Sequence, residues 1–229
     1  RGGLLVQLGP ARSGLVDLNA SPLRYQGWGV GAGLGWRAVS DLYRTEVLVS
    51  GAGSRLTSSI STDEQNRETT YEAAARASVM RRVHDFERPA VTLFAGAQLS
   101  VAGLGRFHSF PHGASETFAD FFVLLGPAVQ WEHQRRGGTV FSGAVAVPLI
   151  SAVARTPYYG FKDTPTLEWR GPAALPEVSH TLRMERPLSP RTSMLVEYRA
   201  ALRRDEEPRP LRHIGHWVSL GLELRRRPH

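Results

Sequence analysis

Residues 24 to 38 read RYQGWGVGAGLGWRA, and this stretch decides the fold. Its residues alternate with a period of two, which is typical of a β-strand because successive side chains in a strand point to opposite faces. One face carries the apolar side chains of Trp28, Val30, Ala32, Leu34, Trp36 and Ala38. The other face carries Tyr25, Gly27, Gly29, Gly31, Gly33, Gly35 and Arg37. The stretch therefore predicts a strand with one apolar face, bordered by tryptophans, and one face of nearly bare backbone.

The same alternation recurs along nearly the whole chain, and apolar residues almost nowhere recur at helical spacing. It predicts ten strands, at residues 3–18, 23–39, 42–56, 69–84, 90–103, 117–134, 139–155, 178–187, 193–204 and 212–226. Most of them are far longer than the roughly 5 or 6 residues of an ordinary strand. They are long enough for the about 9 to 11 tilted residues with which a strand crosses a membrane.

Composition narrows the possibilities further. The chain has 229 residues with no evident linker, which favours a single domain over residues 1–229. It has no cysteine, which excludes disulfide scaffolds and thiolate metal sites. The net charge is +7, but only Lys162 of the 28 basic residues is a lysine and no nucleic-acid-binding motif is present, so nucleic-acid binding is not expected. The longest apolar stretch, residues 144–154, contains Pro148 and is too short for a transmembrane helix.

The connections between the predicted strands alternate in length. Short ones fall at residues 40–41, 85–89, 135–138 and 188–192, and long ones at 57–68, 104–116, 156–177 and 205–211. The first connection on the long side, residues 19–22, is the exception and is short. With these connections and the apolar outer faces, the chain resembles bacterial outer-membrane β-barrels over essentially its full length. The resemblance implies a single closed antiparallel up-and-down barrel with short periplasmic turns and longer outer loops. An even number of strands then places both termini in the periplasm.

If the apolar faces meet lipid, the polar faces line the barrel interior. A barrel of ten strands is only slightly wider than the eight-stranded size that side chains just fill, so long charged side chains can pair across it. The predicted luminal charge network comprises Arg44, Glu46, Glu72, Arg76, Arg82, Asp120, Glu132, Arg183, Glu185, Glu197, Arg199 and Glu223. The glycine face of the opening stretch is expected to accommodate a bulky neighbour such as Phe94, Phe118 or Trp217.

Aromatic side chains near strand ends on the apolar faces are expected at the membrane interface, where amphipathic rings are favoured. The candidates for this position are Trp28, Trp36, Trp131 and Tyr198. A second aromatic group lies in the longest outer loop and predicts either a protein-contact surface or a lid over the barrel mouth. It comprises Tyr158, Tyr159, Phe161 and Trp169.

Candidates for catalysis lie together in the third outer loop, at His108, Ser109, His112 and Glu116. An imidazole beside a hydroxyl and a carboxylate is the combination that activates a nucleophile. Catalytic triads are, however, assembled from distant parts of a fold, so these neighbours in sequence are weak evidence for an active site. Histidine pairs such as His213 and His216 lack a third ligand at fixed spacing, and we predict neither a metal site nor a cofactor.

Arginines near the outer ends of strands are expected to pair with phosphates of lipopolysaccharide; the candidates are Arg106, Arg155, Arg203 and Arg204. The sequence thus favours an outer-membrane barrel with a structural or interaction role rather than an enzyme. Its expected partners are outer-membrane lipids, including lipopolysaccharide, and other envelope proteins. Three alternatives stay open: a narrow pore for small solutes, an outer-membrane hydrolase acting on lipid or peptide, and a soluble barrel.

Overall fold

The structure is a computed structural model that describes residues 2–17, 21–58, 67–87, 90–109, 115–135, 137–155, 167–171, 177–206 and 210–225. Its strands are β1 (Gly2–Asp17), β2 (Ser21–Val39), β3 (Tyr43–Ser58), β4 (Arg67–Phe86), β5 (Val91–Ser109), β6 (Ser115–Gln134), β7 (Val140–Ala146), β8 (Ile150–Arg155), β9 (Leu167–Arg170), β10 (Glu177–Ser189), β11 (Thr192–Asp205) and β12 (Leu211–Arg225). No helix in these segments is long and apolar enough to cross a membrane.

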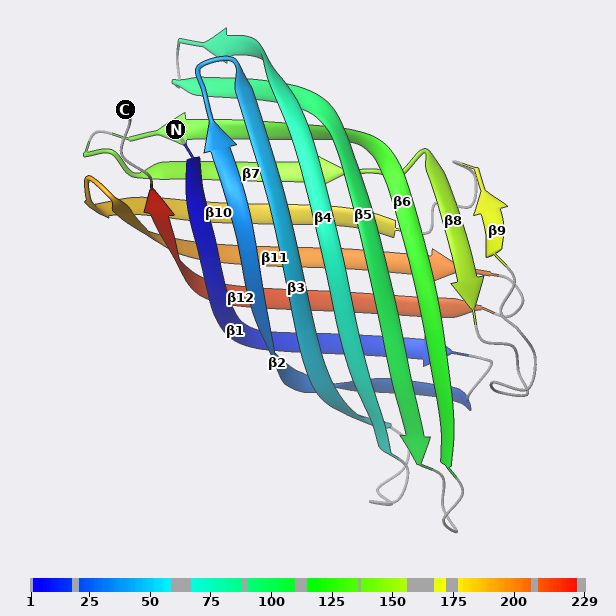
Figure 1. Cartoon of the computed structure of the whole chain (residues 1–229). Helices are drawn as coiled ribbons and strands as arrows, with labels where there is room; N and C mark the ends of the chain where they lie inside the picture. The colour runs from blue at the N-terminus through cyan, green and yellow to red at the C-terminus, as the bar shows by residue number, and fades with distance from the viewer. Residues whose placement is uncertain are drawn as a thin grey trace.

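The strands form one closed antiparallel barrel (Figure 1). Neighbours in sequence pair from β1 to β6, and β12 pairs with β1 to close the ring. β7 and β8 pair with successive parts of β6, so together they take the place of one strand. We call each strand position around the ring a stave, and β7 with β8 forms the seventh of ten staves. Short connections lie at one end of the barrel, where Gly3 pairs with Arg225; we call this the turn end and the opposite end the loop end.

Burial follows the alternation of the sequence. On β1, Leu5 and Gln7 are buried inside the barrel, and the intervening Leu4, Val6 and Leu8 are exposed on the outer surface. Large exposed apolar side chains occur on the outer faces of all the other staves as well. Such a continuous apolar surface would make a soluble protein aggregate. The prediction of an antiparallel barrel with an apolar exterior is therefore confirmed.

Glycines allow β2 and β3 to approach closely on the inner side of the wall. A Cβ added at Gly27 would lie 1.8 Å from the carbonyl oxygen of Arg55, and one at Gly29 would lie 1.8 Å from that of Gly53. No real side chain fits at these distances, so both positions require glycine. Part of the predicted glycine face is thus required by the close approach of the β3 backbone.

The structure departs from the predicted strands in several places, one of which is the short strand β9 within the predicted loop 156–177. Pro148 divides the predicted strand 139–155 into β7 and β8, because proline has no N–H to donate to the ladder. The backbone nitrogens of Val147 and Leu149 still donate to β6, so both halves stay on the same neighbour. β5 also extends to Ser109, well beyond the predicted end at residue 103. This extension turns predicted loop residues into residues of the barrel wall.

Candidate functional site

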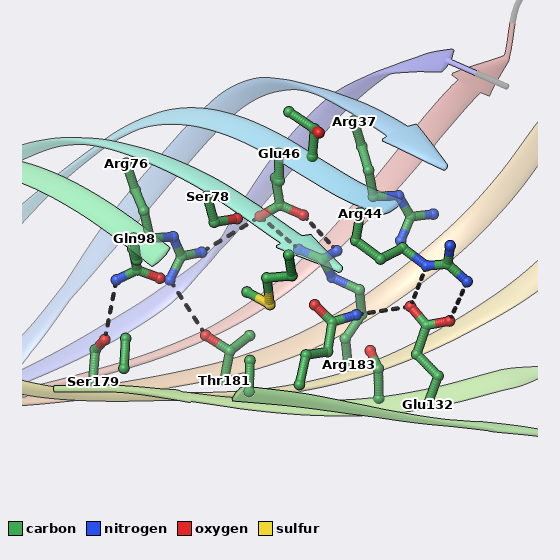
Figure 2. A pocket seen from close by; sticks show the side chains of 16 residues that line it. Arg37, Arg44, Glu46, Arg76, Ser78, Gln98, Glu132, Ser179, Thr181 and Arg183 are labelled. Atoms are coloured by element: carbon green, nitrogen blue, oxygen red, sulfur yellow. Dashed lines mark hydrogen bonds and ion pairs between the residues drawn. The ribbon is translucent and has the colours of Figure 1, made fainter. Parts of the chain in front are cut away.

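The barrel interior is crossed by ion pairs at both ends. Near the turn end, the guanidinium of Arg183 on β10 donates to Glu46 on β3 at 2.7 Å and pairs with Glu197 on β11 at 2.5 Å. Arg76 on β4 lies 3.6 Å from the same Glu46 carboxylate, and Arg199 donates to Glu197 at 2.5 Å. The contact between Glu46 and Arg183 joins strands on opposite walls of the barrel, and Figure 2 shows it together with Arg76.

Two further groups complete this end. Arg44 on β3 makes a bidentate pair with Glu132 on β6, with N to O distances of 2.8 and 2.7 Å. Arg37 and Arg225 share the carboxylates of Glu185 and Glu223. We call the whole set the turn-end network; it comprises Arg37, Arg44, Glu46, Arg76, Glu132, Arg183, Glu185, Glu197, Arg199, Glu223 and Arg225.

A second set of ion pairs, the loop-end network, lies near the other end. Its centre is Arg106, which pairs with Asp17 and lies 2.5 Å from Asp120. Arg155 lies within 3.4 to 3.7 Å of Asp17, Asp120 and Asp205. The network also includes Arg203 with Glu177 at 2.7 Å and with Glu72 at 3.4 Å.

These positions correct one sequence expectation. Arg106, Arg155 and Arg203 are buried inside the barrel and paired with carboxylates, so they do not reach lipid phosphates. The expectation was wrong for Arg106 because β5 continues past residue 103 and its alternation carries Arg106 inward. Of the four arginines, only Arg204 is exposed, and it pairs with Glu206.

A cavity of about 110 Å³ lies between the two networks. It has room for several water molecules. Trp217 projects toward the glycine face of β2, since a Cβ added at Gly31 or Gly33 would lie 3.2 or 3.1 Å from its ring. The guanidinium of Arg199 stacks on that ring at 4.7 Å. The small side chains that line the cavity are Ser50, Ala52, Ala74, Ser100, Ala102 and Ala201.

Eleven of the twelve residues of the predicted luminal charge network lie inside the barrel and carry one of the ion pairs described above. Arg82 is the exception. It is exposed at the turn end and pairs with Asp85, because β4 extends beyond the lumen there and its register shifts between Arg82 and His84. The alternation placed Arg82 inside, and that placement was wrong.

The predicted catalytic loop is not assembled into a triad in the described residues. His108 is buried on β5, where its Nε2 shares a hydrogen bond of 3.2 Å with the Tyr25 hydroxyl and its Nδ1 lies 3.7 Å from Glu68. Ser109 and Glu116 are exposed, and His112 lies outside the described residues. A buried imidazole and an exposed hydroxyl do not form a nucleophile and base pair.

The histidine pair on β12 points in two directions. His213 is buried in the interior, and His216 lies on the outer surface, where its Nδ1 contacts the Tyr198 hydroxyl at 2.8 Å. Two histidines on opposite faces of a strand cannot share a metal ion. No cluster of three or more potential metal ligands occurs in the part of the chain that the structure describes.

The aromatic candidates are distributed as follows. Trp28, Trp36 and Trp131 are exposed on the outer surface; Trp36 and Trp131 lie near strand ends, whereas Trp28 lies near the middle of β2 and not at an end as the sequence suggested. Tyr198 also faces outward, but it lies in the middle of β11 with its hydroxyl held by His216, so it is not at an end as the sequence suggested. Trp169 is exposed on β9 at the loop end; Tyr158, Tyr159 and Phe161 lie outside the described residues.

The sequence missed most of the loop-end network, although a signal for it was present. Continuing the alternation from Ser100 through Leu104 leads directly to Arg106 and His108 on the inner face. Arg155 and Arg203 likewise continue the inner faces of β8 and β11. Treating residues 104–116 as a loop hid Arg106. Arg155 and Arg203 lie within the predicted strands 139–155 and 193–204, but they were expected to face lipid phosphates at the outer strand ends.

No protein-family model matches this chain, and no curated protein matches it in sequence. Solved structures do match it in fold. The outer-membrane protease OmpT from Escherichia coli aligns with a TM-score of 0.57 at 9% identity, covering 97% of this chain and 96% of that one. The translocator domain of the autotransporter NalP from Neisseria meningitidis aligns with a TM-score of 0.50 at 11% identity, covering 98% and 88%. The chain thus has the fold of the bacterial outer-membrane β-barrels, here as a closed antiparallel barrel of ten staves.

Proposed function

We propose that the protein is a non-conducting barrel of the bacterial outer membrane that serves as a structural or interaction component of the cell envelope. The observation that supports this most strongly is the pair of ion-paired networks across the lumen. Arg183, Arg44 and Arg106 each join strands that face one another or lie well apart around the ring. Side chains held in this way fill the cross-section that a solute would need.

Single-channel recording in a planar bilayer tests this proposal. The purified barrel is expected to insert without sustained conductance steps, and a shift in gel mobility on boiling serves as the control for folding. Sustained steps from the wild-type protein would overturn the proposal. If those steps also shrink in Gly31→Trp, which narrows the lumen beside Trp217, the protein is a narrow pore.

The orientation of the barrel belongs to the same proposal. We place the turn end and both termini in the periplasm and the loop end outside the cell, because outer-membrane barrels have short periplasmic turns. Since the chain has no cysteine, a single introduced cysteine can be labelled uniquely. Trp169→Cys at the loop end is expected to react with a membrane-impermeant maleimide on intact cells, and Leu188→Cys at the turn end only after the outer membrane is opened. The reverse pattern would invert the orientation.

An interaction role has a candidate surface on β9. Leu167 and Trp169 are 60% and 72% exposed, and they lie two residues apart and so on one face of this short strand. Arg170, beside them, holds the strand to the barrel through Asp205 at 3.8 Å. Exposed aromatic side chains on a fixed element are typical anchors for a protein partner. We propose this face for contact with another envelope protein.

A further inference from the structure

The outer surface carries a groove that no residue of the described segments fills. It has a volume of about 540 Å³ and crosses β2 to β6. Two neighbouring rows of outward-facing residues form it, as the strand register shows. One row is Val30, Gly53, Tyr71, Gly105 and Ala119; the other is Ala32, Gly51, Ala73, Gly103 and Phe121.

The glycines of this groove differ from Gly27 and Gly29, which lie against the β3 backbone. A Cβ added at Gly51 would be 3.5 Å from its nearest neighbour, and one at Gly105 would be 3.8 Å away, which are ordinary contact distances. At Gly29 the same distance is 1.8 Å. Glycine inside a strand weakens it unless some close approach requires it. No close contact with a described residue requires glycine at Gly51 or Gly105, so their small size leaves room for a bound molecule.

One row closer to the loop end, the groove meets basic side chains. Arg55 follows Gly53 on the same face of β3, and its partner across the ladder on β2 is Trp28. The guanidinium of Arg12 stacks on the Trp28 ring at 5.5 Å. Arg12 and Arg55 are both exposed, and neither has a carboxylate partner in the segments that the structure describes. The arginines inside the barrel, in contrast, are paired.

Unpaired arginines on a lipid-facing surface are costly unless they reach the interface and an anionic group there. Guanidinium groups bind phosphate through paired, charge-assisted hydrogen bonds. A groove lined by glycine, alanine and aromatic rings suits an acyl chain. The arrangement therefore combines a phosphate site with an apolar slot that starts directly beside it.

We infer that this groove binds one molecule of lipid A, the phosphorylated lipid of the outer leaflet, with its phosphate on Arg12 and Arg55 and an acyl chain along Gly51, Gly53 and Gly105. This inference rests on the proposed position in the outer membrane with the loop end outside. It gives the expected lipopolysaccharide contact a defined site, which differs from the four arginines that the sequence suggested.

Binding of diphosphorylated lipid A to the purified barrel in detergent tests the inference, measured by native mass spectrometry. Two double variants address the two parts of the site: Arg12→Ala with Arg55→Ala, and Gly51→Leu with Gly105→Leu. Each is expected to raise the dissociation constant about tenfold or more. Dephosphorylated lipid A is expected to bind the wild type as weakly as the arginine variant binds the intact lipid. Arg81→Ala at the turn end and Ala97→Leu on the outer face of β5 are the matched controls, with unchanged affinity expected.

Equal affinity of all variants would overturn the inference, and so would an equal loss in Arg81→Ala, which would mean unspecific attraction by charge. If the variant with Gly51→Leu and Gly105→Leu binds lipid A with the affinity of the wild type, the acyl chain does not lie in the groove. The gel shift on boiling confirms that each variant is folded. Because this assay uses no conductance, a wild type that conducts would overturn the proposed non-conducting role without affecting the lipid result.

Discussion

The two ion-pair networks use the same residue types in different surroundings. In the turn-end network, the side chains of Arg44 and Glu132 are each 17% exposed and that of Arg225 is 25% exposed. In the loop-end network, Arg106 and Asp120 are fully buried and Arg155 is 2% exposed. An apolar cluster that includes Leu104, Phe122 and Leu124 occupies the same end of the interior. The Arg44–Glu132 pair is thus partly hydrated and the cluster around Arg106 and Arg155 is dry, so the same kind of ion pair has a different energetic weight at these two places.

Arg106→Met is expected to have the largest effect. It removes the buried guanidinium that pairs with both Asp17 and Asp120 in a dry environment. Loss of one partner from a buried pair costs about 3 to 5 kcal/mol. The free energy of unfolding in urea, measured in lipid vesicles, checks this value. Arg12→Met, the same change on the outer surface, serves as the control, and a comparable loss in both variants would contradict the dry environment.

The second prediction separates buried from exposed side chains within the loop end. His108→Ala is expected to destabilise the barrel by about 2 kcal/mol, because it leaves a cavity and removes the hydrogen-bond partner of Tyr25. Ser109→Ala, its exposed neighbour, is expected to stay within about 0.5 kcal/mol of the wild type. Urea unfolding measures both. If Ser109→Ala costs as much as His108→Ala, the inward and outward assignment of these two residues is wrong.

Arg44→Met at the turn end is expected to have the smallest effect, about 1 kcal/mol, since water partly compensates the loss of the pair with Glu132. The contact of Arg44 with the Phe94 ring, at 4.2 Å, is partly preserved by the methionine side chain. Raising the salt concentration is expected to reduce this cost, because partly hydrated charges are screened, and to leave the cost of Arg106→Met nearly unchanged. Equal salt dependence of the two variants would remove the distinction between the networks.

The alternation of the sequence was sufficient to predict the barrel and the inward direction of residues such as Glu46, Glu132 and Glu197. It could not predict where strands end, because polar residues are common both in loops and on the inner faces of strand ends. Arg106 was assigned to a loop for this reason. It also could not predict pairing: that Glu46 meets Arg183 depends on which strands face each other once the ring closes.

The outward arginines were the least predictable part of the candidate sites. Arg12 lies within a predicted strand, but its proposed role in binding a lipid phosphate depends on Trp28 and Arg55, which belong to other strands. Only the register between β1, β2 and β3 brings these three side chains into one row. Gly51 and Gly29 look alike in the sequence, and the distances to neighbouring atoms alone distinguish the one that borders open space.

The ion pairs across the lumen also affect the rate at which the folded barrel unfolds. Glu46 and Arg183 are 137 residues apart in the chain, and Arg37 and Glu223 are 186 apart. Hairpins of neighbouring strands can form before either pair exists, so these contacts arise only when the first and last strands have met. Interactions that form after the folding transition state slow unfolding and leave the folding rate nearly unchanged. The networks therefore stabilise the ring after it has closed. Their main effect is to lower the unfolding rate, which lengthens the lifetime of the inserted protein.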